Sequence, residues 1–410
     1  MEAALALVCL CDPLSAEQAA QAHLPLRHGG LAFPSAAATA AAAFLGSTLE
    51  TLAEVAAATG YAANLLLDPL RCSLQNDLTA AEAAWEAGAG ESFWEAADDT
   101  GAAQRWEDAT EQPLASQRQR ALTRKLHSAA RERLLACLAE PEQARLRSAG
   151  GGGAGAWLLN PAAGARCQLT DAHLACALRM RLGQDACWPN TCARCHGPLD
   201  ARGHHAHVCV RGRYRLARHN AVQRAIGRIL RSLAPFGIGT LEHPVHVPEW
   251  DTPTERAILD LRIEGGPGGP RRFADVVVPH PVATHHQRPA AMQDGAAAAY
   301  SERDKHRRYG PHVLPLAVES YGRWGPAAMK WWRALAQQVA HADPALQHQG
   351  AWAVPGLLNR WWAEAGAALQ RANAEAILAS IGLDGLPSGD AGGGEAAAFE
   401  LLLPGLADDA

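Results

Sequence analysis

The chain has no long apolar run and few lysines, and its cysteines are too sparse for a disulfide framework. No stretch of about eighteen residues is apolar throughout, so the 410-residue sequence predicts no membrane-spanning segment. The first residues include the acidic Glu2, no basic residue and only a short apolar run, unlike a secretory signal. We therefore expect an intracellular protein that does not associate with membranes.

Lysine is almost absent, and positive charge comes from arginine. Only Lys125, Lys305 and Lys330 are lysines, in a chain with a formal net charge of −5. That net charge hides an asymmetry, because residues 201–241 contain eight arginines and no acid. This segment is therefore the part of the chain that favours an anionic partner.

The order of expected elements predicts an α+β protein with an all-helical N-terminal region at 1–147. A helix is expected from Ser35 to Gly60, with others at Thr79–Ala97 and Pro113–Glu140. The run SAGGGGAGA at 148–156 has the composition of a linker, so we expect a domain boundary there. Downstream we expect a helix with a zinc knuckle at 157–215, an α/β domain at 216–345, a C-terminal helix at 346–383 and a disordered tail at 384–410.

Within these later regions, apolar periodicity predicts specific elements. Helices are expected at Thr170–Gly183 and Leu216–Leu233, and later at Pro289–Arg308, Pro326–Ala340 and Pro355–Ile381. Strands are expected at Leu241–Val247, Ala257–Ile263, Phe273–Val278 and Val313–Ser320. A mixed sheet flanked by helices follows from this order.

A cysteine–histidine cluster predicts a structural zinc site. Cys192 and Cys195 form a C-x2-C pair, and His204, His205 and Cys209 follow within the next segment. Two cysteines on a tight turn with a later His/Cys pair can surround zinc tetrahedrally and leave no open position. Reduced cysteines beside surface histidines are the alternative, and the choice between His205 and His204 as ligand stays open.

The arginine-rich segment begins two residues after the last cysteine of this cluster. The helix expected at 216–233 places Val222 and Ile226 on one face and the later arginines on the opposite one. A solvated helix face is the simplest explanation, whereas zinc cluster and arginines together favour binding to a phosphate backbone. The candidate contacts are Arg211, Arg213, Arg215, Arg218, His219, Arg224, Arg228 and Arg231.

Two aspartates lie in the expected strands AILDLRI and RFADVVV. If the hairpin is symmetric about its glycine- and proline-rich turn, Asp260 and Asp275 lie opposite each other and project to one face. A register shift of one residue would place them on opposite faces. Paired carboxylates suit Mg²⁺ or Mn²⁺, which can activate water, although pairing with nearby arginines is the alternative.

The helix AAAAYSERDKHRRY follows, with Lys305 three residues after Glu302 and one turn before Tyr309. A lysine near paired carboxylates can supply the point charge used in phosphodiester cleavage. A solvated surface lysine is the alternative.

The order of motifs along the chain resembles the C-terminal half of non-LTR retrotransposon proteins. The motifs are, in order, the zinc cluster, CVRGRYRLARHNAV, DLRI, ADVVVPHPV, the Lys305–Tyr309 segment and PLAVESYG. Those proteins carry a zinc knuckle and a restriction-endonuclease-like nicking domain. The similarity covers about Leu169–Leu335, and Gln21–Ser47 is similar to the thumb that follows the reverse transcriptase palm.

The resemblance implies zinc ligands at Cys192, Cys195, one histidine and Cys209, metal ligands at Asp260 and Asp275, and a catalytic Lys305. It also implies that Tyr309 and the Arg218–Asn220 run lie near the catalytic site. The implied function is Mg²⁺-dependent DNA nicking in the nucleus of a eukaryote, with DNA and element RNA as partners. No polymerase site is expected, because Val276 follows Asp275 where a second aspartate is needed. A nucleic-acid-binding module without nuclease activity, or a helical scaffold, are the rival hypotheses.

Overall fold

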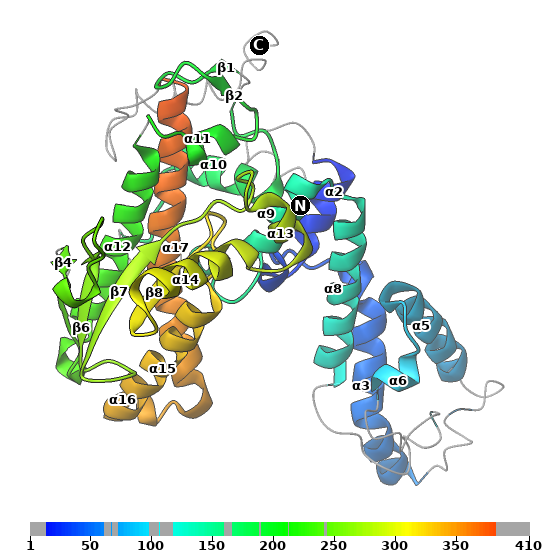
Figure 1. Cartoon of the computed structure of the whole chain (residues 1–410). Coiled ribbons are helices and arrows are strands. Elements are labelled where there is room, and N and C mark those ends of the chain that lie inside the picture. The colour runs from blue at the N-terminus through cyan, green and yellow to red at the C-terminus, as the bar shows by residue number, and fades with distance from the viewer. Residues whose placement is uncertain are drawn as a thin grey trace. The chain divides into compact units, whose positions relative to one another are not determined.

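The computed structural model describes residues 14–60, 67, 73–97, 106, 118–159, 166–187, 190–211, 213–241 and 244–382. The described residues form a helical unit, within 20–28 and 32–137, and an α+β unit, within 138–382 together with 14–19 and 29–31 (Figure 1). The tail expected at 384–410 and the segment 113–117 of an expected helix lie outside the described residues.

The helical unit is built around α3 (Ala36–Thr59), α5 (Leu74–Ala89), α6 (Phe93–Ala97) and α8 (Arg118–Cys137). The expected helix at 35–60 is confirmed, because the Ser35 side chain accepts a hydrogen bond from the Ala38 amide and Gly60 ends the helix at φ 70°. The single helix expected at 79–97 is wrong: Gly90 adopts φ 75° and separates α5 from α6.

Helix α3 is long and apolar enough, by length and composition, to cross a membrane. Its leucines at 45, 49 and 52 are buried in the core that this helix shares with α5 and α8. Gly46 allows close contact, since a Cβ there would lie 2.4 Å from the Gln119 backbone. The buried residues form one stripe of α3, only 28% of its most apolar window is buried, and a single such helix is weak evidence for a membrane span.

The glycine-rich run at 148–156 is a packed segment and not the expected linker. Ser148 and Ala149 end α9 (Glu140–Ala149), and Ala154 and Ala156 are buried. A Cβ at Gly153 would lie 2.6 Å from the Trp362 ring, and the φ of Gly153 is +81°. Glycine is needed here because, without a Cβ, it lets the indole ring pack directly on the backbone.

A small mixed sheet lies at the centre of the α+β unit, in the order β3-β6-β7-β8. Strands β6 (Leu261–Glu264) and β7 (Arg271–Val277) form an antiparallel hairpin, and β8 (Val313–Ala317) pairs parallel to β7. The strand expected at 241–247 is divided into β3 (Gly239–Leu241) and β4 (Val245–His246), which pairs with β5 (Ile258–Leu259) in a separate ribbon. The expectation of a mixed α+β fold is confirmed at this level.

Two buried cores meet along the C-terminal helix α17 (Ala353–Ser380). One core joins the sheet to α12 (Tyr214–Ser232), α15 (Pro326–Ala342) and the first half of α17. The other joins α10 (Asp171–Leu182), the cysteine cluster and the last turns of α17. Figure 1 shows α17 running from α15 at one end to α11 (His204–Val208) and the short ribbon β1 (Asn190–Thr191)–β2 (Pro198–Leu199) at the other.

The helices expected at 170–183, 216–233, 326–340 and 355–381 correspond to α10, α12, α15 and α17. The helix expected at 289–308 is divided into α13 (Gln287–Met292) and α14 (Ala296–Tyr309), since Gly295 adopts φ 73° between them. A short helix, α16 (Pro344–Gln347), follows α15, and α2 (Ala16–His23) lies near the N-terminus.

Candidate functional site

The cysteine cluster holds four potential metal ligands close together. One ligand atom from each of Cys192, Cys195, His205 and Cys209 lies within 4.8 Å of all the others. Cys195 Sγ lies 3.1 Å from His205 Nε2. Three thiols and one imidazole form a donor set that suits zinc, and four protein ligands would leave no position open for a substrate. The cluster therefore can hold a structural metal such as zinc.

Local backbone geometry presents these ligands. His196 adopts φ 59°, and its amide donates to the Cys192 carbonyl, so the first two cysteines sit on a tight turn. The Gly197 amide donates to Cys195 Sγ, and this hydrogen bond is the main cause of the lowered pKa of the Cys195 thiol. A lowered thiol pKa favours the thiolate, which is the form that binds metal.

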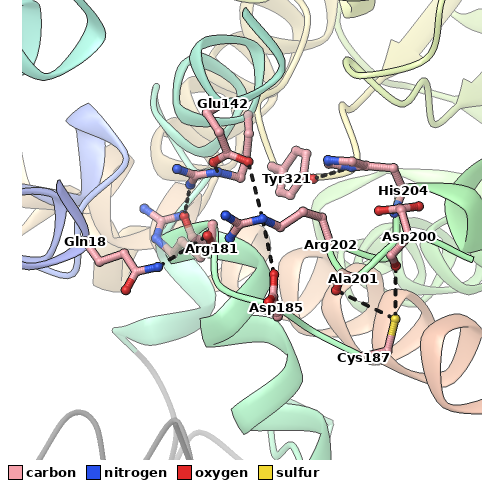
Figure 2. Close-up of polar contacts among 12 residues, drawn as sticks. Gln18, Glu142, Arg181, Asp185, Cys187, Asp200, Ala201, Arg202, His204 and Tyr321 are labelled. Atoms are coloured by element: carbon pink, nitrogen blue, oxygen red, sulfur yellow. Dashed lines mark hydrogen bonds and ion pairs between the residues drawn. The ribbon is translucent and has the colours of Figure 1, made fainter. Parts of the chain in front are cut away.

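The structure selects His205 over His204. Both residues begin α11, whose first amides donate to the Asp200 carboxylate at 2.9 and 2.7 Å. His204 is not among the clustered ligands: its Nδ1 lies 3.4 Å from the Tyr321 hydroxyl (Figure 2), and it also lies 3.3 Å from His280 Nε2. The alternative ligand left open by the sequence is therefore not in the cluster.

The knuckle formed by residues 190–209 is fixed to α17. The Ala193 amide donates to the Ser380 carbonyl at 2.9 Å, and a Cβ at Gly203 would lie 2.9 Å from Ile377 Cδ1. Beside it, the Arg202 guanidinium lies near Glu142 and Asp185 (Figure 2). The knuckle and the C-terminal helix thus belong to one packed core.

The expected carboxylate pair is also brought together. Leu261 pairs with Ala274, and the same register places Asp260 opposite Asp275, as the symmetric hairpin predicts. Ala274 and Val276 face the main core, so Asp275 projects to the opposite face, where α14 lies. Ligand atoms of Asp260, Asp275 and His219 lie within 4.8 Å of one another. These three residues form the carboxylate cluster.

Each member of the carboxylate cluster has a defined partner. Asp260 Oδ2 lies 3.0 Å from His219 Nε2 and accepts a hydrogen bond from the Val276 amide at 2.7 Å. Lys305 Nζ lies 2.7 Å from Asp275 Oδ2. Tyr309 is buried one turn further along α14, with Lys305 Nζ 5.7 Å from the centre of its ring.

The pKa values of the two aspartates are shifted in opposite directions. Burial raises the pKa of Asp275 to about 6, the charge of Lys305 opposes this increase, and the charge of Asp260 adds to it. Burial alone would raise the pKa of Asp260, but the hydrogen bond and charge of His219 bring it below its usual value. Burial alone would lower the pKa of His219, and Asp260 raises it overall. Two carboxylates in such proximity favour a cation between them.

His219 was expected among the nucleic-acid contacts, and the resemblance placed the Arg218–Asn220 run near the catalytic site, but His219 was not expected to be a partner of Asp260. His219 lies on the side of α12 that faces the sheet, one residue after the buried Arg218. Gln223, one turn later, donates to the Asp260 carbonyl at 3.0 Å. The spacing of four residues between His219 and Gln223 is a helical signal that could have indicated this face.

The arginine-rich segment is only partly a surface. Arg218 is 1% exposed, so it is not part of an exposed basic surface; it donates to the Nδ1 and carbonyl oxygen of His207 at 2.7 and 3.0 Å. Arg228 is half-buried and pairs with Glu364 of α17 at 3.0 Å. The exposed members are Arg211, Arg213, Arg215, Arg224 and Arg231.

No known protein family matches the chain, and no curated protein matches it significantly.

Proposed function

We propose that the chain is a metal-dependent DNA endonuclease that nicks one strand and carries a structural zinc. It would be related to the C-terminal part of non-LTR retrotransposon proteins, with a restriction-endonuclease-like domain around the β6–β7 hairpin. The observation that carries the proposal is the convergence of Asp260, Asp275 and His219, with Lys305 beside them.

The proposed chemistry is hydrolysis of a phosphodiester. A new bond forms between phosphorus and a water oxygen, the bond to the leaving 3′ oxygen breaks, and that oxygen takes up a proton. Mg²⁺ or Mn²⁺ held by Asp260 and Asp275 would polarise the water and the phosphate. Lys305, already 2.7 Å from Asp275, would stabilise charge on the phosphate oxygens.

The exposed arginines at the start of α12 support DNA as the partner, with element RNA as a second partner. Arg211, Arg213 and Arg215 follow the last cysteine of the knuckle directly. A zinc-clamped knuckle would fix the direction of this basic surface relative to the carboxylate cluster.

The test is nicking of supercoiled plasmid by the full chain in Mg²⁺ and in Mn²⁺. Asp275→Asn and Asp260→Asn should abolish nicking, whereas Asp304→Asn, on α14 but outside the carboxylate cluster, should retain it. If wild type and both cluster variants nick the supercoiled plasmid equally, the assignment of Asp260 and Asp275 as metal ligands is refuted. Wild-type protein that binds DNA but does not nick it would support the binding-module hypothesis instead.

A further inference from the structure

A cavity of about 430 Å³ lies between the knuckle and the loop that follows β7. Arg215 and Arg218 of α12 line one part of it, and residues 278–280 and 282–286 line another. Its volume lies within the range of small-molecule sites, which is about 300–1,000 Å³. The cavity is separate from the carboxylate cluster, none of whose three residues lines it.

The charge of the cavity wall is positive. Arg218 is fully buried, and its hydrogen-bond partners, His207 and Asn373, are neutral acceptors. The single acid in the lining is Asp200, whose two oxygens already accept the amides of His204 and His205. A buried guanidinium without a carboxylate is costly unless an anion compensates it.

Two buried hydrogen-bond donors of the lining residues also lack acceptors. Because arginine can only donate, its bond to His207 Nδ1 makes Nε2 the protonated nitrogen of the neutral imidazole. Among the described residues, neither His207 Nε2 nor Arg218 Nε has a hydrogen-bond partner. Burial lowers the pKa of His286 to about 4, so this ring adds no charge at neutral pH.

We propose that this cavity binds a phosphate ester, with Arg218 as the buried counter-charge and Arg215 at the rim. Phosphate matches the need for an anion with several acceptor oxygens, and arginine is well suited to it. The volume leaves room for an attached sugar and base. The site goes beyond the proposed nicking reaction, since phosphate binding does not need Asp260 or Asp275.

The experiment is calorimetric titration of the full zinc-loaded chain with inorganic phosphate, and then with a thymidine dinucleotide in 5′-phosphorylated and 5′-hydroxyl forms. Arg215→Gln should weaken phosphate binding about tenfold, as expected for one lost charged hydrogen bond. Arg256→Gln, at an exposed arginine outside the cavity lining, should change it less than twofold.

Thr284 gives a second test that leaves both arginines intact, because it is exposed and lines the cavity. Thr284→Glu should weaken phosphate binding through charge repulsion, whereas Thr284→Gln, of nearly equal size, should not. No binding of phosphate by wild type, or equal binding by all variants, would overturn the proposal.

The two dinucleotides distinguish the source of the phosphate. Tighter binding of the 5′-phosphorylated form would identify a nucleic-acid end, and tighter binding of inorganic phosphate would identify a free ion. Asp275→Asn should bind phosphate like wild type, so failure of the nuclease and failure of this site can be told apart.

Discussion

Lys305 Nζ lies 2.7 Å from Asp275 Oδ2, in an ion pair whose two side chains are 19% and 8% exposed. Lys305 therefore serves as the counter-charge of a buried carboxylate in the absence of a cation. A divalent cation at Asp275 would compete with the ammonium and release it toward a phosphate. This exchange makes the lysine a sensitive test of the proposed chemistry.

We expect Lys305→Arg to reduce nicking by at least about tenfold, although it keeps the charge. The planar guanidinium is larger than an ammonium and cannot occupy the same position beside Asp275. Plasmid nicking rates measure the effect. Lys330→Arg, exposed on α15, is the matched control and should retain the wild-type rate.

Cation affinity should fall at acidic pH. Because the pKa of Asp275 is about 6, its carboxyl is largely protonated at pH 5, and the proton must leave before a cation binds. We expect Mn²⁺ to bind roughly tenfold more weakly at pH 5 than at pH 7.5. Calorimetric titration at both values measures this. A pH-independent affinity in wild type, or a pH dependence retained by Asp275→Asn, would contradict the assignment.

One zinc per chain should be found by metal analysis of protein purified without chelator. His205→Asn and Cys192→Ser should lower the zinc content, whereas His204→Asn should preserve it, because His204 faces Tyr321 and not the cysteines. Cys137→Ser, at an exposed cysteine outside the cluster, is the control for general thiol loss. Equal zinc content in all four variants would disprove the ligand set.

DNA affinity should depend on the exposed arginines and not on Arg228. Each lost phosphate contact should reduce the slope of log affinity against log salt by about 0.9 for duplex DNA. We therefore expect a shallower slope for Arg211→Gln and Arg224→Gln. Arg228→Gln should keep the wild-type slope, because Arg228 is paired with Glu364. Fluorescence anisotropy at several salt concentrations measures these slopes. An unchanged slope for Arg211→Gln and Arg224→Gln, or a shallower one for Arg228→Gln, would contradict the prediction.

Replacing Gly153 should destabilise the α+β unit. Gly153→Ala places a Cβ 2.6 Å from Trp362 and forces φ +81° on a residue with a side chain. Strain and overlap together should lower the free energy of unfolding by about 2–4 kcal/mol. Gly356→Ala is the control: it lies in α17 with nothing near its Cβ, so it should be neutral or stabilising by up to about 1 kcal/mol. Denaturant unfolding measures both.

Features fixed by local chemistry were predictable from the sequence. Ser35 and Thr170 cap their helices through side-chain oxygens, and Gly60 and Gly183 end them in left-handed conformations. The hairpin register was also predictable, because the turn between β6 and β7 relates the strands symmetrically.

Features that depend on distant contacts were not predictable. The composition of the glycine-rich run is that of a linker, but Trp362, more than two hundred residues later in the sequence, packs on it. The local sequence predicts an exposed, unpaired Arg228, but the fold brings Glu364 of α17 beside it as an ion-pair partner. The burial of Arg218 had a local signal, because it lies four residues before Val222, on the apolar face of α12.

Helix α17 sets the spacing between the two ends of the α+β unit. Its 28 residues span about 42 Å. Leu358 and Trp361 anchor it in the core beneath the sheet, and Ala374 and Ile377 anchor it in the core of the knuckle. One residue inserted between these anchors would turn one end by about 100° relative to the other. The helix therefore fixes both the distance and the rotation between the two cores, so insertion or deletion of a single residue between the anchors would misalign one core with the other.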